Sequence, residues 1–224
     1  MKVLFIQAKA NKDIIEALNK NIKYIPEKKI GTVTTVQFVE QLEKVKQTLE
    51  ANNKIAVIGK PSGSAITDGQ ILGCDVSAAT NIASDVDCFL YIGTGNFHSL
   101  GLLAKTDKPL YALNPFTSQL KEISLEEKQK LMKREILKLA QFKDCKTVGI
   151  LVSTKLGQCQ LQYDVEELKE KLEIQGKKAY LFACDNITNA ELQNFPHIQG
   201  WVNTACPRLA DDVFDRPFIN ACEL

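Results

Sequence analysis

Two cysteines lie in loops whose surroundings suit chemistry. Cys74 belongs to the segment GQILGCD, residues 69–75, and Cys206 belongs to WVNTACPR, residues 201–208. Each loop adjoins a predicted buried strand, and α/β folds place their sites in loops at the carboxyl ends of parallel strands. The residues 77–80 that follow Cys74 open a predicted helix, whose N-terminus favours a thiolate. A single cysteine is also commonly a small packing residue, so both interpretations stay open at this point.

The other cysteines of the chain divide into two groups. The count of seven is odd, the spacings are irregular and there is no export signal, so a disulfide framework is not expected. Cys88, Cys145 and Cys184 border apolar runs and are interpreted as core residues. Cys159 and Cys222 have less regular surroundings, and their roles stay open.

A glycine-containing turn is the next candidate. The segment YIGTGNFHSLG, residues 91–101, reads as a strand, a turn with Gly93 and Gly95, and a helix. Glycines let the backbone approach a ligand closely, and the turn exposes N–H groups to a carboxylate or phosphate. The segment is not GxGxxG, so it is a weak nucleotide signature. His98 is a candidate site acid or ligand-orienting donor, or it caps the helix.

The second half of the chain has an equivalent strand exit. In GILVSTKLGQ, residues 149–158, the polar residues Ser153, Thr154, Lys155 and Gln158 suit a small polar ligand, although a solvated loop has the same composition. The chain has no HExxH, GxSxG or P-loop motif, so the zinc protease, α/β-hydrolase and Walker ATPase classes lack their signatures.

Composition restricts the class of protein further. The chain has 224 residues, 45% of them hydrophobic, and a net charge of +1, which gives no broad basic field for nucleic acid. No apolar run reaches the roughly 18 residues of a membrane helix, and the apolar residues at the start are too few for a signal peptide. We therefore expect a cytoplasmic protein that binds neither nucleic acid nor membrane.

Apolar runs alternate with helical patterns along the whole chain. The runs are short and apolar on both sides, as in parallel strands covered by helices on both faces. They cover residues 3–6, 31–35, 55–58, 88–92, 110–113, 148–152, 179–183, 200–204 and 217–219. Amphipathic helices are predicted over residues 38–49, 125–142 and 164–175, with a capping box at Ser124 and Glu127 and a stop at Gly176.

This alternation predicts an α/β fold with two similar small domains. Each is expected to contain a four-stranded, mainly parallel sheet flanked by helices. The first domain, residues 1–124, carries Cys74 and the turn at residues 93–98, and the second, residues 125–224, carries Cys206. The run over residues 3–6 is a ninth strand without a clear place in either sheet.

Several segments together resemble the diphthamide synthase family. They are GTVTTVQ at 31–37, LGCD at 72–75, IGTGNFH at 92–98, NPF at 114–116, ACPR at 205–208 and PFINACE at 217–223. Their order is similar to that of the second and third domains of the archaeal enzyme, 2-(3-amino-3-carboxypropyl)histidine synthase. That family transfers the 3-amino-3-carboxypropyl group of S-adenosylmethionine to a histidine of elongation factor 2, using radical chemistry on a four-iron, four-sulfur cluster.

The resemblance implies particular site residues. It implies that Cys74 and Cys206 are two of three cluster ligands and that they meet at one site. It further implies that the cofactor pocket is lined by Gly93, Thr94, Gly95, Asn96, His98, Ser153 and Gln158. The chain departs from the family at Thr94, where an acid is usual, and at Ser99, where a proline is usual.

The domain that carries the third cysteine ligand in the family has no counterpart here. The resemblance therefore implies a subunit or fragment whose partner is a second copy or a second synthase subunit, with elongation factor 2 as the protein substrate. Two other hypotheses are a noncatalytic accessory partner of a complete synthase and a two-lobed small-molecule binding protein.

Overall fold

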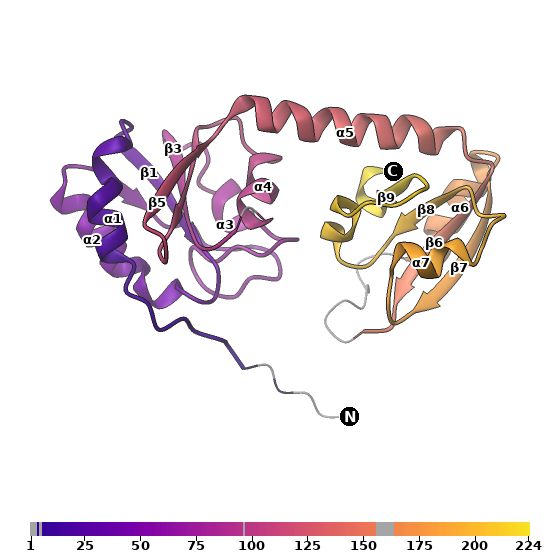
Figure 1. The fold of residues 1–224 in the computed structure, drawn as a ribbon, viewed down its shortest axis with the longest axis horizontal. Coiled ribbons are helices and arrows are strands. Elements are labelled where there is room, and N and C mark those ends of the chain that lie inside the picture. Colours follow the sequence, from indigo (N-terminus) through magenta and orange to yellow (C-terminus); the bar gives the residue numbers. More distant parts are fainter. Residues whose placement is uncertain (1–3, 5, 96, 156–163) are drawn as a thin grey trace. The chain divides into compact units, whose positions relative to one another are not determined.

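The computed structural model describes residues 4, 6–95, 97–155 and 164–224. The chain forms two compact units, Met1–Gln129 and Lys130–Leu224 (Figure 1). The boundary that we predicted between residues 124 and 125 falls at the start of helix α5 (Leu125–Lys143), which continues from the first unit into the second.

The first unit is built on one sheet with strand order β2-β1-β3-β4-β5. Its strands are β1 (Lys29–Thr34), β2 (Ile55–Val57), β3 (Cys88–Ile92), β4 (Leu110–Asn114) and β5 (Gln119–Ile123). The first four are parallel, and β5 runs antiparallel to β4. The central strands β1 and β3 are almost completely buried, which accounts for their apolar runs.

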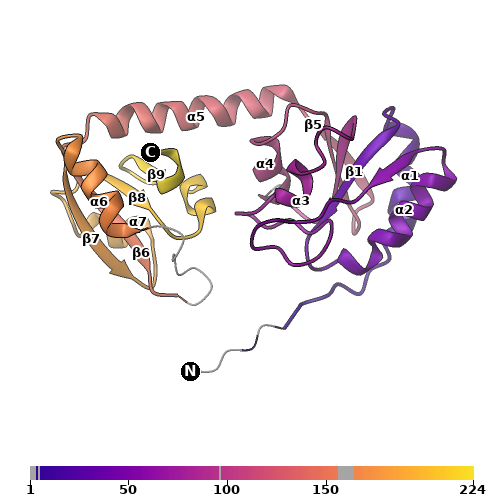
Figure 2. The ribbon, with the colours of Figure 1, turned by 180° about the vertical axis from the view of Figure 1, so that it is seen from behind.

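Helices cover both faces of this sheet (Figure 1). They are α1 (Ile15–Asn21), η1 (Ile22–Tyr24), η2 (Val39–Gln41), α2 (Leu42–Ala51), α3 (Ser77–Thr80) and α4 (Phe97–Leu103). On one face, Leu18 of α1 and Val45 of α2 pack in a core with Ile30 and Leu90. α3 and α4 lie on the other face, as both views show (Figures 1 and 2).

The second unit has a four-stranded sheet in the order β7-β6-β8-β9, and all of its pairs are parallel. Its strands are β6 (Thr147–Ser153), β7 (Lys178–Cys184), β8 (Gly200–Asn203) and β9 (Phe218–Asn220). Its helical segments besides α5 are α6 (Val165–Ile174), α7 (Asn189–Gln193), η3 (Pro207–Asp211) and η4 (Ala221–Glu223). Leu172 of α6 packs in one core with Val202, and Leu192 of α7 packs in another with Trp201.

The predicted helix signals are confirmed. The Glu127 amide donates to Ser124 Oγ at 3.3 Å and the Ser124 amide donates to the Glu127 carboxylate at 3.1 Å, which forms the capping box of α5. Asp164 caps α6 through the amides of Glu166 and Glu167. Gly176, just after α6, has φ +81°, so it provides the left-handed stop that glycine favours.

The α/β class with two largely parallel sheets is confirmed, but two details of the prediction are wrong. The first sheet has a fifth strand, β5, an edge strand that we did not predict because its exposed polar residues separate Leu120 from Ile123. The strand predicted over residues 3–6 fails where the structure describes it, since Leu4 and Ile6 lie outside any strand and are each 83% exposed. Val3 and Phe5 lie outside the described residues.

Among the described residues, no helix is both long enough and apolar enough to cross a membrane.

Candidate functional site

Thr34, the last residue of β1, holds two candidate segments of the first unit at the same edge of the sheet. Its amide donates to the Gly69 carbonyl at 2.9 Å and its carbonyl accepts from the Ile71 amide at 2.8 Å, so the loop that leads to Cys74 continues the sheet beside β1. On the other side, Thr34 pairs with Ile92, the residue before the glycine turn. The Cys74 loop and the glycine turn are therefore anchored to one residue.

Cys74 is exposed on a closed turn. The Leu72 amide donates to the Asp75 carbonyl at 2.7 Å, and the Asp75 amide donates back to Leu72 at 3.3 Å. The Asp75 side chain, 8% exposed, fixes this turn because its carboxylate accepts from the amides of Ala65 at 2.7 Å and Ser77 at 2.9 Å. The turn thus presents a thiol on a rigid backbone.

The Asp75 carboxylate is held in its charged form. Burial by itself would raise its pKa, but hydrogen bonds from the Ala65 amide, the Ser77 hydroxyl and amide and the Ser64 amide outweigh burial and leave the pKa below its ordinary value. The side chain also needs the glycine at position 63, since a Cβ there would lie 2.6 Å from Asp75 Oδ2. This carboxylate therefore acts as a clamp for the Cys74 loop.

The glycine turn has the backbone that its sequence predicts. Gly95 has φ +67°, and a Cβ at Gly93 would lie 2.2 Å from the Tyr91 hydroxyl oxygen. That hydroxyl is 3.4 Å from Nδ1 of half-buried His98. Burial raises the pKa of Tyr91 to about 12, so the hydroxyl stays neutral. Tyr91 is a site residue that we did not predict, although it lies two positions before Gly93 on the same face of β3.

In the second unit, the buried side chain of Asn203 organises the Cys206 loop. Its Oδ1 accepts from the Ala205 amide at 3.0 Å, and its Nδ2 donates to the Cys206 carbonyl at 2.9 Å and to Asn220 Oδ1 at 2.8 Å. Cys206 itself is half-buried and caps the 3-10 helix η3. Asn203 stands at the end of β8, and we predicted no role for it because it lies inside the apolar run over residues 200–204.

The Ser153 strand exit lies at the same edge as the Cys206 loop. β6 and β8 are parallel neighbours, and Thr204 donates to the Leu151 carbonyl through its amide at 3.1 Å and its hydroxyl at 2.8 Å. Ser153 is 1% exposed, and its Oγ accepts from the Lys155 amide at 3.2 Å. Thr154 and Lys155 instead bond the loop after β7, where Lys155 Nζ donates to Asn186 at 2.7 Å.

Two predicted cofactor-pocket residues, Asn96 and Gln158, lie outside the described residues, as does Cys159. Thr94 and Gly95 are exposed in the glycine turn. The structure describes the two units separately, so the expectation that Cys74 and Cys206 meet stays a prediction. Within the described part of each unit, no group of three or more His, Cys, Asp or Glu side chains forms a ready metal site.

Cys88 and Cys145 are confirmed as core cysteines, whereas Cys184 is half-buried and packs against the edge of a core. Burial raises the pKa of Cys88 to about 12, and burial also raises the pKa values of Cys145 and Cys184. These three thiols stay protonated at neutral pH and are poor metal ligands. Cys222, in η4, is exposed and remains a candidate for a ligand or reactive thiol.

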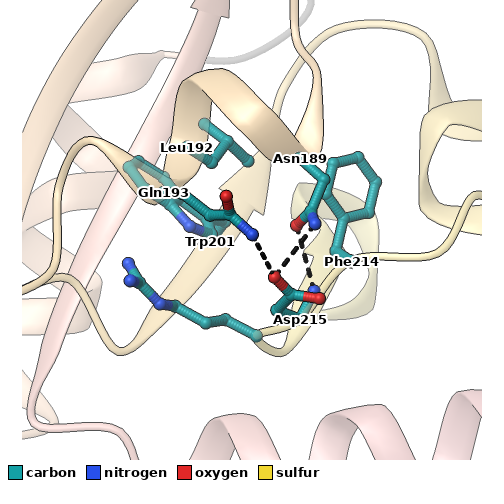
Figure 3. A pocket seen from close by; sticks show the side chains of 7 residues that line it. Asn189, Leu192, Gln193, Trp201, Phe214 and Asp215 are labelled. Carbon is teal, nitrogen blue, oxygen red and sulfur yellow. Dashed lines mark hydrogen bonds between the residues drawn. The ribbon is translucent and has the colours of Figure 1, made fainter.

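A small pocket at the amino-terminal side of β8 and β9 has a structural role. The Asp215 carboxylate accepts from Asn189 Nδ2 at 3.0 Å and Gln193 Nε2 at 2.5 Å, while Trp201 and Leu192 form the apolar wall (Figure 3). Its volume of about 30 Å³ holds about one water molecule. The bonds tie α7 to the segment before β9, and the pocket has no room for a cofactor.

The fold and these loops define a class: a two-unit α/β protein in which loops at the carboxyl edges of two largely parallel sheets carry cysteines that are not buried, Cys74 in the first unit and Cys206 in the second. The sequence matches the family model described as putative diphthamide synthesis protein over residues 1–224. The chain therefore belongs to the diphthamide synthesis family.

Individual relatives agree with this assignment. The chain is 32% identical over 211 residues to 2-(3-amino-3-carboxypropyl)histidine synthase of Pyrococcus horikoshii, covering 93% of this chain and 59% of that protein. It is 25% identical over 227 residues to human 2-(3-amino-3-carboxypropyl)histidine synthase subunit 1, covering 99% of this chain and 50% of the relative. The chain thus spans between half and three-fifths of the length of these two relatives.

Solved structures show the same fold. The crystal structure of Dph2 from Pyrococcus horikoshii matches with a TM-score of 0.86 and 30% identity, over 96% of this chain and 62% of that chain. A second crystal structure of the same protein, with a 4Fe-4S cluster, matches with a TM-score of 0.85 over the same shares.

Proposed function

We propose that this chain is the part of an aminocarboxypropyl transferase that supplies two ligands to a four-iron, four-sulfur cluster. The enzyme would transfer the 3-amino-3-carboxypropyl group of S-adenosylmethionine to a histidine of elongation factor 2, in the first step of diphthamide synthesis. The relatives named as synthases and the Dph2 structure with a 4Fe-4S cluster support this proposal.

The observation that carries the proposal is the contrast among the described cysteines. Cys74 is exposed and Cys206 is half-buried, and both stand on turns fixed by the buried polar side chains of Asp75 and Asn203. Burial raises the pKa values of Cys88, Cys145 and Cys184. Thiolates on rigid turns suit an iron–sulfur cluster, so Cys74 and Cys206 fit as its ligands.

When bound, the cluster would supply the electron that cleaves the bond between the cofactor's sulfur and its aminocarboxypropyl group. The residues of the chain would orient the reactants. The turn at Gly93–Gly95 would let the cofactor approach the backbone, and His98, 3.4 Å from the neutral Tyr91 hydroxyl, would present a fixed imidazole to a polar group of the ligand.

Anaerobic reconstitution with iron and sulfide tests the proposal directly. We expect the wild-type chain to take up iron and turn brown, and we expect Cys74→Ser and Cys206→Ser each to reduce the bound iron and the visible absorbance severalfold. Cys184→Ser is the matched control, because Cys184 ends β7 at the same edge of the second sheet but is held protonated by burial. Equal colour in all four proteins would contradict the proposal.

A noncatalytic accessory role is the second candidate. It is favoured by the name subunit 1 of several relatives, which is consistent with a complex of different subunits. A chain that takes up no iron but co-purifies with a complete synthase would support this role instead.

A further inference from the structure

A buried hydroxyl at the carboxyl edge of the first sheet makes no hydrogen bond within the part of the chain that the structure describes. Thr35, the first residue after β1, is 9% exposed, and its Oγ1 is buried without a hydrogen-bond partner among the described residues. A buried hydroxyl is normally hydrogen-bonded, because burying it without a partner costs free energy. An unmatched hydroxyl beside a candidate site points to a ligand that supplies the partner.

Thr35 directly follows Thr34, the residue that contacts both the Cys74 loop and the strand before the glycine turn. Thr34 is flanked by Ile92 of β3 on one side and by Gln70 of the Cys74 loop on the other. Thr35 is the next residue along the chain, so it stands at the edge where the Cys74 loop and the glycine turn leave the sheet.

The alternation of side chains along β1, extended by one residue past its end, gives the face on which we expect the Thr35 side chain. Ile30 of β1 packs in the core formed with α1 and α2, whereas a Cβ at Gly31 would contact Phe89 and Ile82 on the other face. Thr35 has the parity of Gly31, and strand side chains alternate with period two. Tyr91 has the same parity on β3, and its hydroxyl meets His98 above Gly93.

Other buried polar atoms without a partner differ from Thr35 in their location. Thr32 Oγ1 shares this property but belongs to a completely buried residue inside β1, away from the strand end where the Cys74 loop and the glycine turn leave the sheet. Glu27 Oε2 lies just before β1, at the opposite edge of the sheet. Thr35 is the member of this set that stands at the edge with Cys74 and the glycine turn.

Resting on the proposed function, we infer that the Thr35 hydroxyl binds the α-amino-acid end of the S-adenosylmethionine cofactor. A hydroxyl donates one hydrogen bond and accepts others, so it suits either the carboxylate or the amino group of that end. The glycine turn beside it leaves space, since a Cβ at Gly95 would have nothing within 4 Å. The group that is transferred would thus be held beside the Cys74 loop.

Two probes isolate this contact by calorimetry on the full chain. S-adenosylhomocysteine carries the α-amino-acid end, and methylthioadenosine lacks it. We expect Thr35→Val to weaken S-adenosylhomocysteine binding about tenfold, the value of one lost hydrogen bond, and to leave methylthioadenosine binding unchanged. Thr35→Ser, which keeps the hydroxyl, should bind both probes like the wild type.

Thermal unfolding of the ligand-free variants separates a binding role from a structural one. Thr35→Val should unfold at the same temperature as the wild type or higher, because it removes an unmatched polar group without changing the shape. A lower unfolding temperature, an unchanged Kd for S-adenosylhomocysteine or an equal loss for both probes would overturn the inference. A valine variant that does not fold would itself count against the inference. In that case the pair Thr35→Ala and Thr35→Ser compares binding of S-adenosylhomocysteine without and with the hydroxyl.

The same measurements distinguish failure of the proposed function from failure of the inference about Thr35. If the wild-type chain binds neither probe, both the proposed function and this inference are overturned. If the wild type binds S-adenosylhomocysteine and Thr35→Val binds it equally well, the inference alone is overturned.

Discussion

The hydroxyl of Thr34 donates a hydrogen bond of 2.6 Å to the carbonyl oxygen of Ile92, and both residues are buried. This bond joins the carboxyl ends of the two central strands, β1 and β3, at the point where each chain segment leaves the sheet. The backbone of Thr34 also holds the Cys74 loop through Gly69 and Ile71. A single threonine thereby couples the position of the cysteine loop to that of the glycine turn.

Removing this hydroxyl should destabilise the first unit measurably. We expect Thr34→Val to lower the free energy of unfolding by about 1–2 kcal/mol, because a buried hydrogen bond to Ile92 is lost while the side-chain volume is kept. Thr34→Ser keeps the donor and should lose less. Urea unfolding followed by circular dichroism measures both variants, and equal stability of Thr34→Val and the wild type would show that the bond contributes nothing.

Asp75 should make the stability of the first unit depend on pH. Its folded-state pKa is lowered, so its carboxylate stabilises the fold fully above the unfolded-state pKa of about 4. That contribution decreases as the pH falls from there toward the lower folded-state pKa. We expect Asp75→Asn to cost roughly 1.5–3 kcal/mol at neutral pH, with the difference from the wild type shrinking under acid conditions.

The control for this experiment is Asp68→Asn, which changes an exposed carboxylate in the same loop. It should leave both the stability and its pH profile close to those of the wild type. A constant difference between Asp75→Asn and the wild type across the acid range would mean that the carboxylate charge is not what holds the Cys74 turn.

Asn203 should be the main support of the Cys206 loop. Replacing it by Leu removes three hydrogen bonds and leaves the Ala205 amide, the Cys206 carbonyl and Asn220 Oδ1 without this partner. We expect a loss of roughly 2–4 kcal/mol in calorimetric unfolding and weaker iron uptake. Asn194→Leu, at an exposed position after α7, should behave like the wild type.

The positions of most strands were predictable because the parallel strands are short apolar runs bounded by turns or helices. The exception, β5, shows the limit of this signal. Its residues show no regular alternation of burial, and the exposed Lys121 and Glu122 give it the composition of a loop. Conversely, Leu4 and Ile6 are apolar yet exposed, because hydrophobic composition by itself does not give a strand a neighbour to pair with.

The candidate site was predictable only at the level of segments. Glycine spacing and loop cysteines are visible in the sequence, whereas the roles of Thr34, Asp75 and Asn203 depend on which strands are neighbours. An asparagine inside an apolar run shows no role until β9 brings Asn220 beside it. The buried hydroxyl of Thr35 is similarly invisible until its surroundings are known.

The last prediction concerns activity of the chain by itself. A four-iron cluster held by Cys74 and Cys206 would have two protein thiolates, one fewer than the resemblance to the synthase family implies. Iron that lacks protein ligands is open to solvent and oxidation, so we expect poor cluster stability and no detectable modification of elongation factor 2 by the isolated chain.

The assay is transfer of labelled aminocarboxypropyl from S-adenosylmethionine to elongation factor 2 under reducing, anaerobic conditions. Transfer should begin when a synthase chain that supplies the third cysteine is added, provided that this second chain is inactive by itself. The same mixture with Cys74→Ser or Cys206→Ser should stay inactive, while Cys184→Ser should support transfer. If the isolated chain is active, another of its own thiols completes the ligand set. Cys222 would be the first thiol to replace by serine, because it is exposed and lies two residues after Asn220. Asn220 in turn bonds Asn203, whose side chain holds the Cys206 loop.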